Sequence, residues 1–108
     1  MALKRLGAIV SGGVIGTADT LFTATGPTVI STIIVTNTNA AAQTYTLAIS
    51  TGTSLPAVLG RLTGVVSIAA GDSHIITLGA TMDATNNKLL CSASAVTVGF
   101  QAFGDDGS

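Results

Sequence analysis

The chain has 108 residues, which is enough for one small domain with a single core. Only 8% of the residues are charged, against about 25% in an average soluble protein, and the formal net charge is −1. This balance gives no electrostatic reason to expect a nucleic acid or an anionic membrane as a partner. Because a solitary soluble domain usually carries more charge, we expect neighbouring protein chains to cover much of the surface. A compact, threonine-rich extracellular domain is the competing explanation.

The single cysteine, Cys91, excludes an intrachain disulfide, so packing alone must hold the fold together. Its apolar setting favours a half-buried small side chain over a reactive thiol. Polar residues and glycines interrupt every apolar stretch, so we expect no membrane-spanning helix. Residues 1–18 resemble a secretory signal, with a basic start, a weakly apolar middle and a small-residue end. Since glycines dilute the middle, we expect these residues to stay in the mature protein.

The first two expected strands, residues 3–10 and 19–24, flank the glycine-rich stretch SGGVIGTADT at residues 11–20. Its spacing is close to the glycine fingerprint of dinucleotide-binding loops, in which a helix N-terminus holds the phosphates. The segment after Gly16 has no helical period and stops at Gly26 and Pro27, so the helix that this chemistry needs is missing. The stretch is therefore interpreted as a flexible connection between two strands.

The clearest strand signal is TVISTIIVTN at residues 28–37, where β-branched residues fill almost every position. Strict alternation would place Val29, Ser31, Ile33 and Val35 on one face and Ile30, Thr32, Ile34 and Thr36 on the other. A second alternating run lies at residues 44–50 after a short polar connection. The two runs together predict an antiparallel hairpin.

Four more short strands are expected at residues 61–69, 73–80, 87–93 and 95–103, separated by turn signals. The stretch between the hairpin and these strands, residues 50–60, has room for one helical turn at most. About eight short strands in one domain spanning residues 1–108 predict an antiparallel β-sandwich, jelly-roll or immunoglobulin-like, or a small barrel. A possible N-terminal arm at residues 1–7 and a frayed tail at 104–108 complete the expected organisation.

The residues that could support catalysis are few. A nucleophile with a base would have to combine His74, the single histidine, with Cys91 or a serine, and no G-x-S-x-G pattern is present. The aspartates fall in turns, in the tail or at a strand start, where they do not form an acid and base pair. We therefore expect no enzymatic activity. The acids are Asp19, Asp72, Asp83, Asp105 and Asp106.

Metal, cofactor and nucleic-acid sites are equally weak in the sequence. Asp72 and His74 are two apart and can share a strand face, but a structural zinc site needs about four ligands. We expect neither a metal nor a cofactor, and leave open a metal shared on the symmetry axis of an oligomer. Surface aromatics beside basic residues would indicate nucleic-acid binding. The aromatics here instead lie at alternating strand positions with aliphatic neighbours, which is typical of core side chains. They are Phe22, Tyr45, Phe100 and Phe103.

The order of several segments resembles that of small virion proteins of tailed bacteriophages. The resemblance rests on six segments: an early Leu6-Gly7, the segment Thr20 to Thr23, the strand Val29 to Asn37, its partner Thr44 to Ile49, and the closing stretches AAGDSHIITLG and VTVGFQAFG. The glycine-rich middle, residues 51–67, departs from that pattern. The resemblance implies a structural role in a virion, as a head decoration protein or a small tail or neck component, and it brings no active-site residues with it.

We accordingly predict a non-enzymatic capsid decoration or cement protein that clamps neighbouring subunits of the major capsid protein in the virion, after assembly in the host cytoplasm. We expect a homo-oligomer, with a trimer favoured by the threefold sites of capsid shells. The alternatives are a tail, neck, baseplate or fibre component and, from another class, a secreted adhesive or carbohydrate-binding domain. The predicted assembly contacts lie in the N-terminal segment, at Leu3, Lys4, Arg5 and Leu6.

Overall fold

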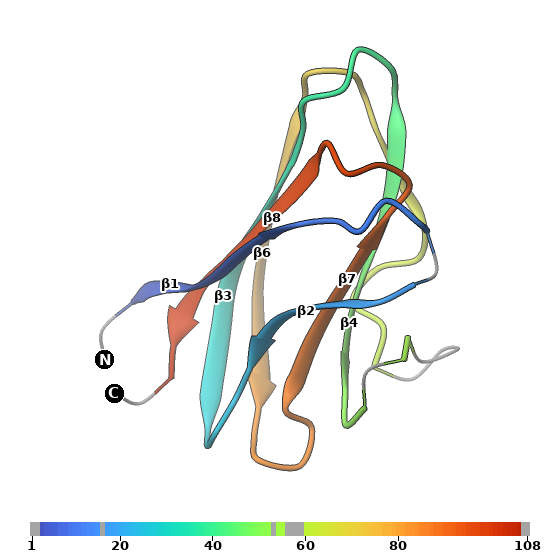
Figure 1. Cartoon of the computed structure of the whole chain (residues 1–108). Coiled ribbons are helices and arrows are strands. Elements are labelled where there is room, and N and C mark those ends of the chain that lie inside the picture. The colour runs from blue at the N-terminus through green and yellow to red at the C-terminus, as the bar shows by residue number, and fades with distance from the viewer. Residues whose placement is uncertain (1–2, 16, 53, 56–59, 107–108) are drawn as a thin grey trace.

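The computed structural model describes residues 3–15, 17–52, 54–55 and 60–106. Within this part of the chain the backbone forms strands and no helix, and the strands build two packed antiparallel sheets (Figure 1). The predicted β-sandwich is confirmed. The strands are β1 (Lys4–Val10), β2 (Asp19–Thr23), β3 (Thr28–Asn37), β4 (Gln43–Ser50), β5 (Val66–Ile68), β6 (Ser73–Met82), β7 (Lys88–Ala93) and β8 (Val98–Asp105).

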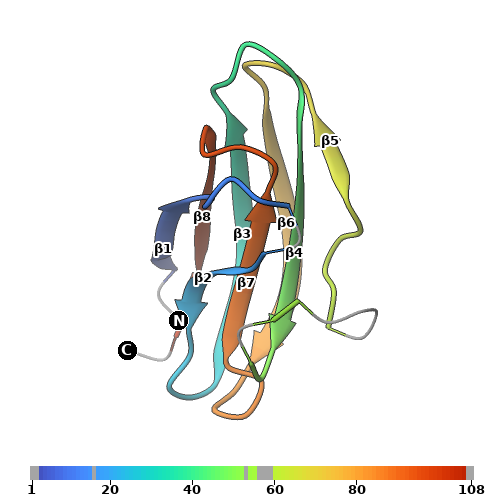
Figure 2. The ribbon, with the colours of Figure 1, turned by 45° about the vertical axis from the view of Figure 1, so that its right-hand side comes forward.

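The strand order identifies the sandwich as a jelly roll. Sheet A has the order β1-β8-β3-β6 and sheet B the order β2-β7-β4-β5. Apart from the step from β4 to β5, each strand lies in the other sheet from the strand before it, which is the double Greek key of the jelly roll. Of the two sandwich types expected from the sequence, the immunoglobulin-like one is therefore wrong. Figure 2 shows the two layers, with β5 at the outer edge of sheet B.

The hairpin predicted between β3 and β4 is also wrong, because β3 lies in sheet A and β4 in sheet B. Asn37, the buried last residue of β3, directs this crossing. Its Nδ2 donates to the carbonyls of Ala41, Ile68 and Ala69 at 3.1–3.2 Å, and its Oδ1 accepts the N–H of Asn39 at 2.9 Å. These bonds fix the chain in a bend that leads across the sandwich instead of back along β3.

The strict alternation predicted for β3 fails at Ser31. The register with both neighbouring strands shifts between Ile30 and Thr32, and β3 carries an extra residue here relative to β8. As a result Ile30 shares the buried face with Ile33, while Thr32 turns outward. The bulge thus moves into the core an apolar side chain that simple counting assigns to the outside.

The core lies between the two sheets and draws side chains from every strand except β1, whose Leu6 and Ile9 pack against its margin. The ring of Tyr45 meets that of Phe100 edge to face, with centroids 6.2 Å apart. Cys91 is fully buried, not half-buried as predicted. The largest fully buried apolar side chains are Tyr45, Phe100, Ile30, Ile33, Leu47, Ile68, Leu89, Leu90, Val35 and Val98.

Two glycines let backbones approach more closely than any side chain would permit. A Cβ on Gly104 in β8 would overlap the backbone carbonyl of Val29, and one on Gly7 in β1 would overlap the carbonyl of Leu21. Gly7 lies directly after Leu6, the extra residue of β1 where its register with β8 shifts. The close contact between β1 and β2 at this corner therefore depends on Gly7.

The remaining strand predictions are correct in position and differ in extent. The strand expected at residues 61–69 is reduced to β5 and an isolated bridge between Arg61 and Ala48. The helical turn considered for residues 50–60 falls largely outside the described residues, which lack 53 and 56–59.

The two predicted terminal extensions are shorter than expected within the described residues. Of the arm at residues 1–7, residues 4–7 belong to β1, which pairs with β8 in sheet A, and residues 1–2 lie outside the described part. Of the tail at 104–108, residues 104 and 105 belong to β8, and 107–108 lie outside it. The Nζ of Lys4 is 3.0 Å from an Asp106 carboxylate oxygen, so the start of β1 is tied to the end of β8.

Candidate assembly surface

The glycine-rich connection between β1 and β2 satisfies its own backbone donors. The N–H of Gly12 is bound by the Asp19 carboxylate at 2.9 Å, and that of Gly13 by the Ser11 hydroxyl at 3.0 Å. Ser11 in turn donates to the Ala93 carbonyl at 3.1 Å. These two N–H groups already have partners from the chain, which agrees with a connecting loop and leaves them no role in holding a phosphate.

The fold separates His74 and Cys91, the base and the nucleophile considered for catalysis, onto different sheets. His74 on β6 faces Tyr45, whose hydroxyl is 2.8 Å from Nδ1, and its Nε2 is 3.8 Å from an Asp72 carboxylate oxygen. Cys91 lies in sheet B, where burial, with a smaller contribution from Asp19, raises the pKa of its thiol to about 12. No hydrogen bond links these described residues into a nucleophile and base pair. Cys91 therefore has neither the exposure nor the thiolate character of a nucleophile.

Among the described residues no group of three or more His, Cys, Asp and Glu side chains could hold a metal ion. Asp72 and His74 do approach each other, as their spacing suggested, but they form a pair. A metal completed by a second copy on a symmetry axis stays an open alternative.

The candidate assembly surface is the outer face of sheet A. On this face the outward side chains of neighbouring strands line up in rows across the sheet. The register pairs of β1, β8, β3 and β6 define these rows, and the burial patterns alternate in agreement. Three complete rows and one partial row result: Val10, Gly99, Thr36 and Ser73; Ala8, Gln101, Ile34 and Ile75; Arg5, Phe103, Thr32 and Thr77; and Asp105, Val29 and Thr81.

Charge is confined to one end of this face. Arg5 and Asp105 belong to the last two rows, whereas the first two rows contain aliphatic, hydroxyl and amide side chains and glycine. Three of the face's apolar residues are prominent: Ile75 is 69% exposed, Val10 is 66% exposed, and Phe103 is partly exposed. Such a face can bury apolar area against a partner while its hydroxyls and amides form hydrogen bonds.

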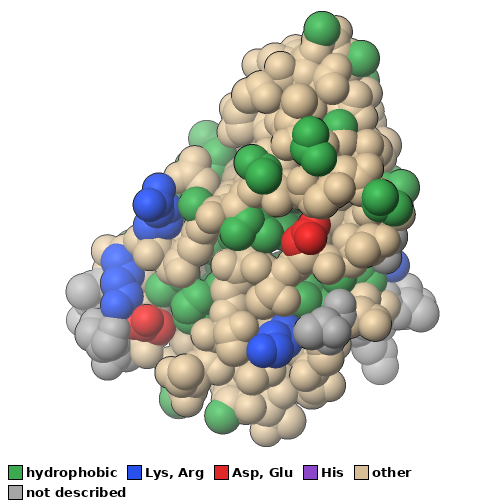
Figure 3. Space-filling view, in the orientation of Figure 1, with side chains coloured by type: hydrophobic (Ala, Val, Ile, Leu, Met, Phe, Trp, Pro, Cys, Tyr) green, Lys and Arg blue, Asp and Glu red, His purple; other side chains and the backbone are tan. Residues whose placement is uncertain are grey.

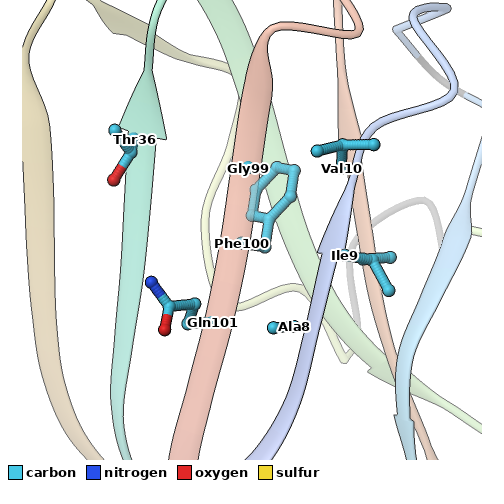
Figure 4. Close-up of a pocket in the computed structure, with 7 residues that line it drawn as sticks. All are labelled: Ala8, Ile9, Val10, Thr36, Gly99, Phe100 and Gln101. Atoms are coloured by element: carbon cyan, nitrogen blue, oxygen red, sulfur yellow. The ribbon is translucent and has the colours of Figure 1, made fainter.

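Two shallow hollows mark the same face. One is lined from β1, β8 and β3, and its lining residues include Val10, Thr36 and Gln101 (Figure 4). The other is lined by Ile34, Phe103 and their neighbours Leu3, Lys4, Ser31 and Thr32. Among the described residues that line the two hollows, no two titratable side chains form an acid and base pair.

The sequence-predicted assembly contacts divide between this face and the core. Leu3, 63% exposed, and Lys4 line the second hollow, and Arg5 stands opposite Phe103 in the third row. Leu6 packs against the core instead. In the view of Figure 3, cationic side chains lie at the side where β1 begins and also at the lower centre, and the upper third shows apolar and uncharged polar surface.

The aromatic residues are placed in the core only in part as predicted. Tyr45 and Phe100 are buried and Phe22 packs against the core, but Phe103 faces outward on β8. The alternation of β8 accounts for this, because Phe100 and Phe103 are three residues apart and so lie on opposite faces of a regular strand. Tyr45 is 2% exposed and bonded to His74, so it cannot serve as a stacking platform for a sugar ring.

No helix of the described residues is long and apolar enough to cross a membrane. No family model matches the sequence, and no curated protein matches it. Among solved structures the fold is similar to a chain in the structure of infectious bursal disease virus, Gx strain, with a TM-score of 0.45 and 15% identity. The match covers 99% of this chain and 32% of that one, so the chain spans about a third of its neighbour's length.

Proposed function

We propose that this chain is a non-enzymatic structural protein of a virion, and that it stabilises a capsid by clamping neighbouring subunits as a decoration or cement protein. The observation that carries the proposal is the outer face of sheet A. Its first two rows present apolar and hydroxyl side chains with no charge, in a chain with only 8% charged residues.

The physical argument concerns what such a face gains from a neighbour. Ile34 and Ile75 stand side by side in the second row, with Gln101 next to Ile34 on β8. Covering the aliphatic side chains removes apolar area from water, which favours association at roughly 25 cal/mol per Å². The amide of Gln101 and the hydroxyl of Thr36 can exchange water for polar groups of the partner. An extended, uncharged sheet face with these properties fits a protein neighbour better than a small ligand.

Two further observations support the same role. Segments in β2, β3, β4, β6 and β8 resemble small virion proteins of tailed bacteriophages. The jelly roll is a fold that viral capsid domains use, although lectin domains and cupins share it, so this support is a fold-level analogy.

The proposed partner is the major capsid protein, and the proposed location is the virion. A small tail, neck, baseplate or fibre component would share the fold and differ in copy number. The trimer expected from capsid symmetry stays a prediction that a mass measurement of the purified chain decides.

The test is binding to phage heads that lack this chain. Purified wild-type protein is mixed with such heads, and co-sedimentation is compared with that of Ile34→Lys and Gln101→Lys, which place a cation in the middle of the second row. We expect both variants to lose most of the binding, because each buries an unpaired charge at the contact. The matched control is Val96→Lys, at a residue that is 61% exposed and lies outside the four rows. Unchanged binding of both folded row variants would contradict the proposal.

A further inference from the structure

The four sheet edges of this sandwich differ in how well they are protected against pairing with another strand. Exposed edges are usually blunted by short length, charge, proline or bulges. At the edges of sheet B, β5 has three residues and β2 has five with Asp19 at its start. In sheet A, β1 begins with Lys4 and Arg5 and is bulged at Leu6. Three of the four edges therefore carry clear protection.

The remaining edge, β6, is ten residues long and contains no aspartate, glutamate, lysine, arginine or proline. It pairs with β3 on one side, and no described strand pairs with its other side. Its first five residues, Ser73 to Thr77, pair with β3 without interruption, and the register shifts only after Thr77. This stretch is a regular, uncharged template for one more strand.

The backbone groups of this stretch point in a direction that permits such pairing. The N–H of Asn37 donates to the Asp72 carbonyl at 2.9 Å, and hydrogen bonds to one neighbour alternate along an antiparallel strand. Counting along β6 from Asp72, the even-numbered residues face β3. The C=O groups of Ser73, Ile75 and Thr77 and the N–H groups of Ile75 and Thr77 therefore face the free side. The N–H of Ser73 points the same way and already donates to the Asp72 carboxylate at 2.8 Å.

The same stretch is self-complementary when two copies of it pair antiparallel with Ile75 at the centre. In an antiparallel pair of two such stretches centred on this residue, Ile75 meets Ile75 of the second copy, and Ser73 meets Thr77. Ile75 is the most exposed of the large apolar side chains in the described residues, at 69%. No pair in this register sets like charges against each other, because the stretch contains no charged residue apart from a histidine opposite Ile76.

We propose that the free edge of β6 binds a second copy of this chain by antiparallel pairing about a twofold axis at Ile75. Ile75 of each copy then exchanges N–H···O=C bonds with Ile75 of the other, and the N–H of Thr77 donates to the Ser73 carbonyl of the other copy. The N–H of Ser73 exchanges its Asp72 acceptor for the Thr77 carbonyl of the other copy, and the two copies of sheet A form one continuous sheet. The second row of the outer face continues across the axis, from Ile34 and Ile75 of one copy to the same residues of the other. The pairing doubles the uncharged face.

This inference rests on one part of the proposed function, self-association, and not on the capsid contact. It can therefore be tested on the purified chain alone. Native mass spectrometry and sedimentation equilibrium of the wild type are expected to give a dimer, in place of the trimer that capsid symmetry alone predicts. Ile75→Lys sets two cations against each other on the axis, so we expect the dimer dissociation constant to rise at least about tenfold. Val10→Lys is the matched control, since Val10 is 66% exposed on the opposite edge of the same face. It should leave the dimer unchanged.

Cysteine substitution tests the register. Ile75→Cys places two thiols opposite each other at a Cα separation that a disulfide can span, so mild oxidation should give a covalent dimer. Thr77→Cys should not, because its partner in this register is Ser73. Cys91 is buried and does not compete.

A single-chain mass at every concentration up to the solubility limit would overturn the pairing, and so would a trimer. Equal cross-linking of both cysteine variants would overturn the register. If Gln101→Lys still dimerises and does not bind phage heads, the pairing holds separately from the capsid contact. If the wild type dimerises and does not bind heads, the proposed function fails and the pairing stands.

Discussion

Gly104 illustrates how a single backbone position constrains this fold. Its missing side chain lets β8 approach Val29 of β3, where a Cβ would overlap the backbone carbonyl. The sequence marks Gly104 only as part of a terminal Phe-Gly and of a predicted frayed tail. Gly104 pairs with Ile30 next to the bulge at Ser31. Because β3 and β8 are far apart in the sequence, local sequence patterns do not reveal this contact.

Gly104→Ala is therefore expected to destabilise the protein by about 1–3 kcal/mol, since a carbonyl in the sheet cannot move aside as a flexible side chain can. Urea unfolding measures the free energy of unfolding. Gly99→Ala in the same strand is the control, because a Cβ there meets its nearest atom, the Ile9 carbonyl oxygen, at 3.8 Å, which is an ordinary contact. Equal stability of the two variants would contradict the assignment.

Cys91 gives the molecule a pH dependence on the alkaline side. Burial raises the pKa of its thiol from 9.0 to about 12, so the folded state holds the proton more tightly than the unfolded state. The resulting stabilisation is fully present below pH 9 and is lost as the pH rises from about 9 towards about 12. Burial also raises the pKa of Tyr45 above its ordinary value of 10.0. The stabilisation from Tyr45 is therefore fully present below about pH 10 and is lost only above it, whereas the loss from Cys91 begins near pH 9.

Between about pH 9 and 10 we expect the free energy of unfolding to fall with a slope approaching one proton. Cys91→Ala should flatten most of this slope, and urea unfolding at several pH values measures both proteins. A wild-type slope that persists unchanged in the variant would show that another group is responsible.

At the scale of the strands, sequence patterns locate nearly every element and fail on how strands associate. The bounds of β3 are correct to the residue because β-branched side chains fill it. Its predicted pairing is wrong, because a short polar connection is compatible with both a hairpin and a crossing between sheets. The bonds of Asn37 to Ile68 and Ala69 decide between the two, and they join residues about thirty positions apart.

The edge of sheet B beyond β4 is formed partly by hydrogen bonds from side chains. Thr63 accepts the N–H of Leu47 with its hydroxyl at 3.1 Å and gives that hydroxyl to the Gly64 carbonyl at 2.8 Å. Its own carbonyl accepts the hydroxyl of Thr46 at 3.1 Å. These contacts add to the backbone bonds that hold the segment before β5 along β4, from Ile49 N–H to the Gly60 carbonyl and from Leu62 N–H to the Leu47 carbonyl.

Thr63→Val should therefore expose the Leu47 amide, which loses its acceptor. We expect hydrogen exchange at this amide to become faster by about tenfold, consistent with the loss of about 1–1.5 kcal/mol for one hydrogen bond. Thr85→Val, in the exposed turn between β6 and β7, is the control. Unchanged protection at Leu47 would mean that other contacts hold this segment.

At the scale of the whole molecule, the composition predicts that neighbouring protein chains cover part of the surface, but it does not identify which face they cover. A low fraction of charged residues predicts covered surface, and the jelly roll concentrates uncharged residues into rows on sheet A. Composition cannot identify this face, because the rows result from the register of four strands and from the bulges in β1 and β3. The N-terminal contacts predicted from sequence come close to this face at Leu3 and Lys4, while Leu6 is taken up by the core.

The measurement that tests the central claim most directly is the number of copies of this chain per purified particle, by quantitative mass spectrometry against the major capsid protein. A capsid decoration protein built on the face of sheet A predicts a ratio near stoichiometric. A handful of copies per particle would contradict the capsid role and place the chain in the tail or neck. Its absence from particles would contradict the virion assignment altogether.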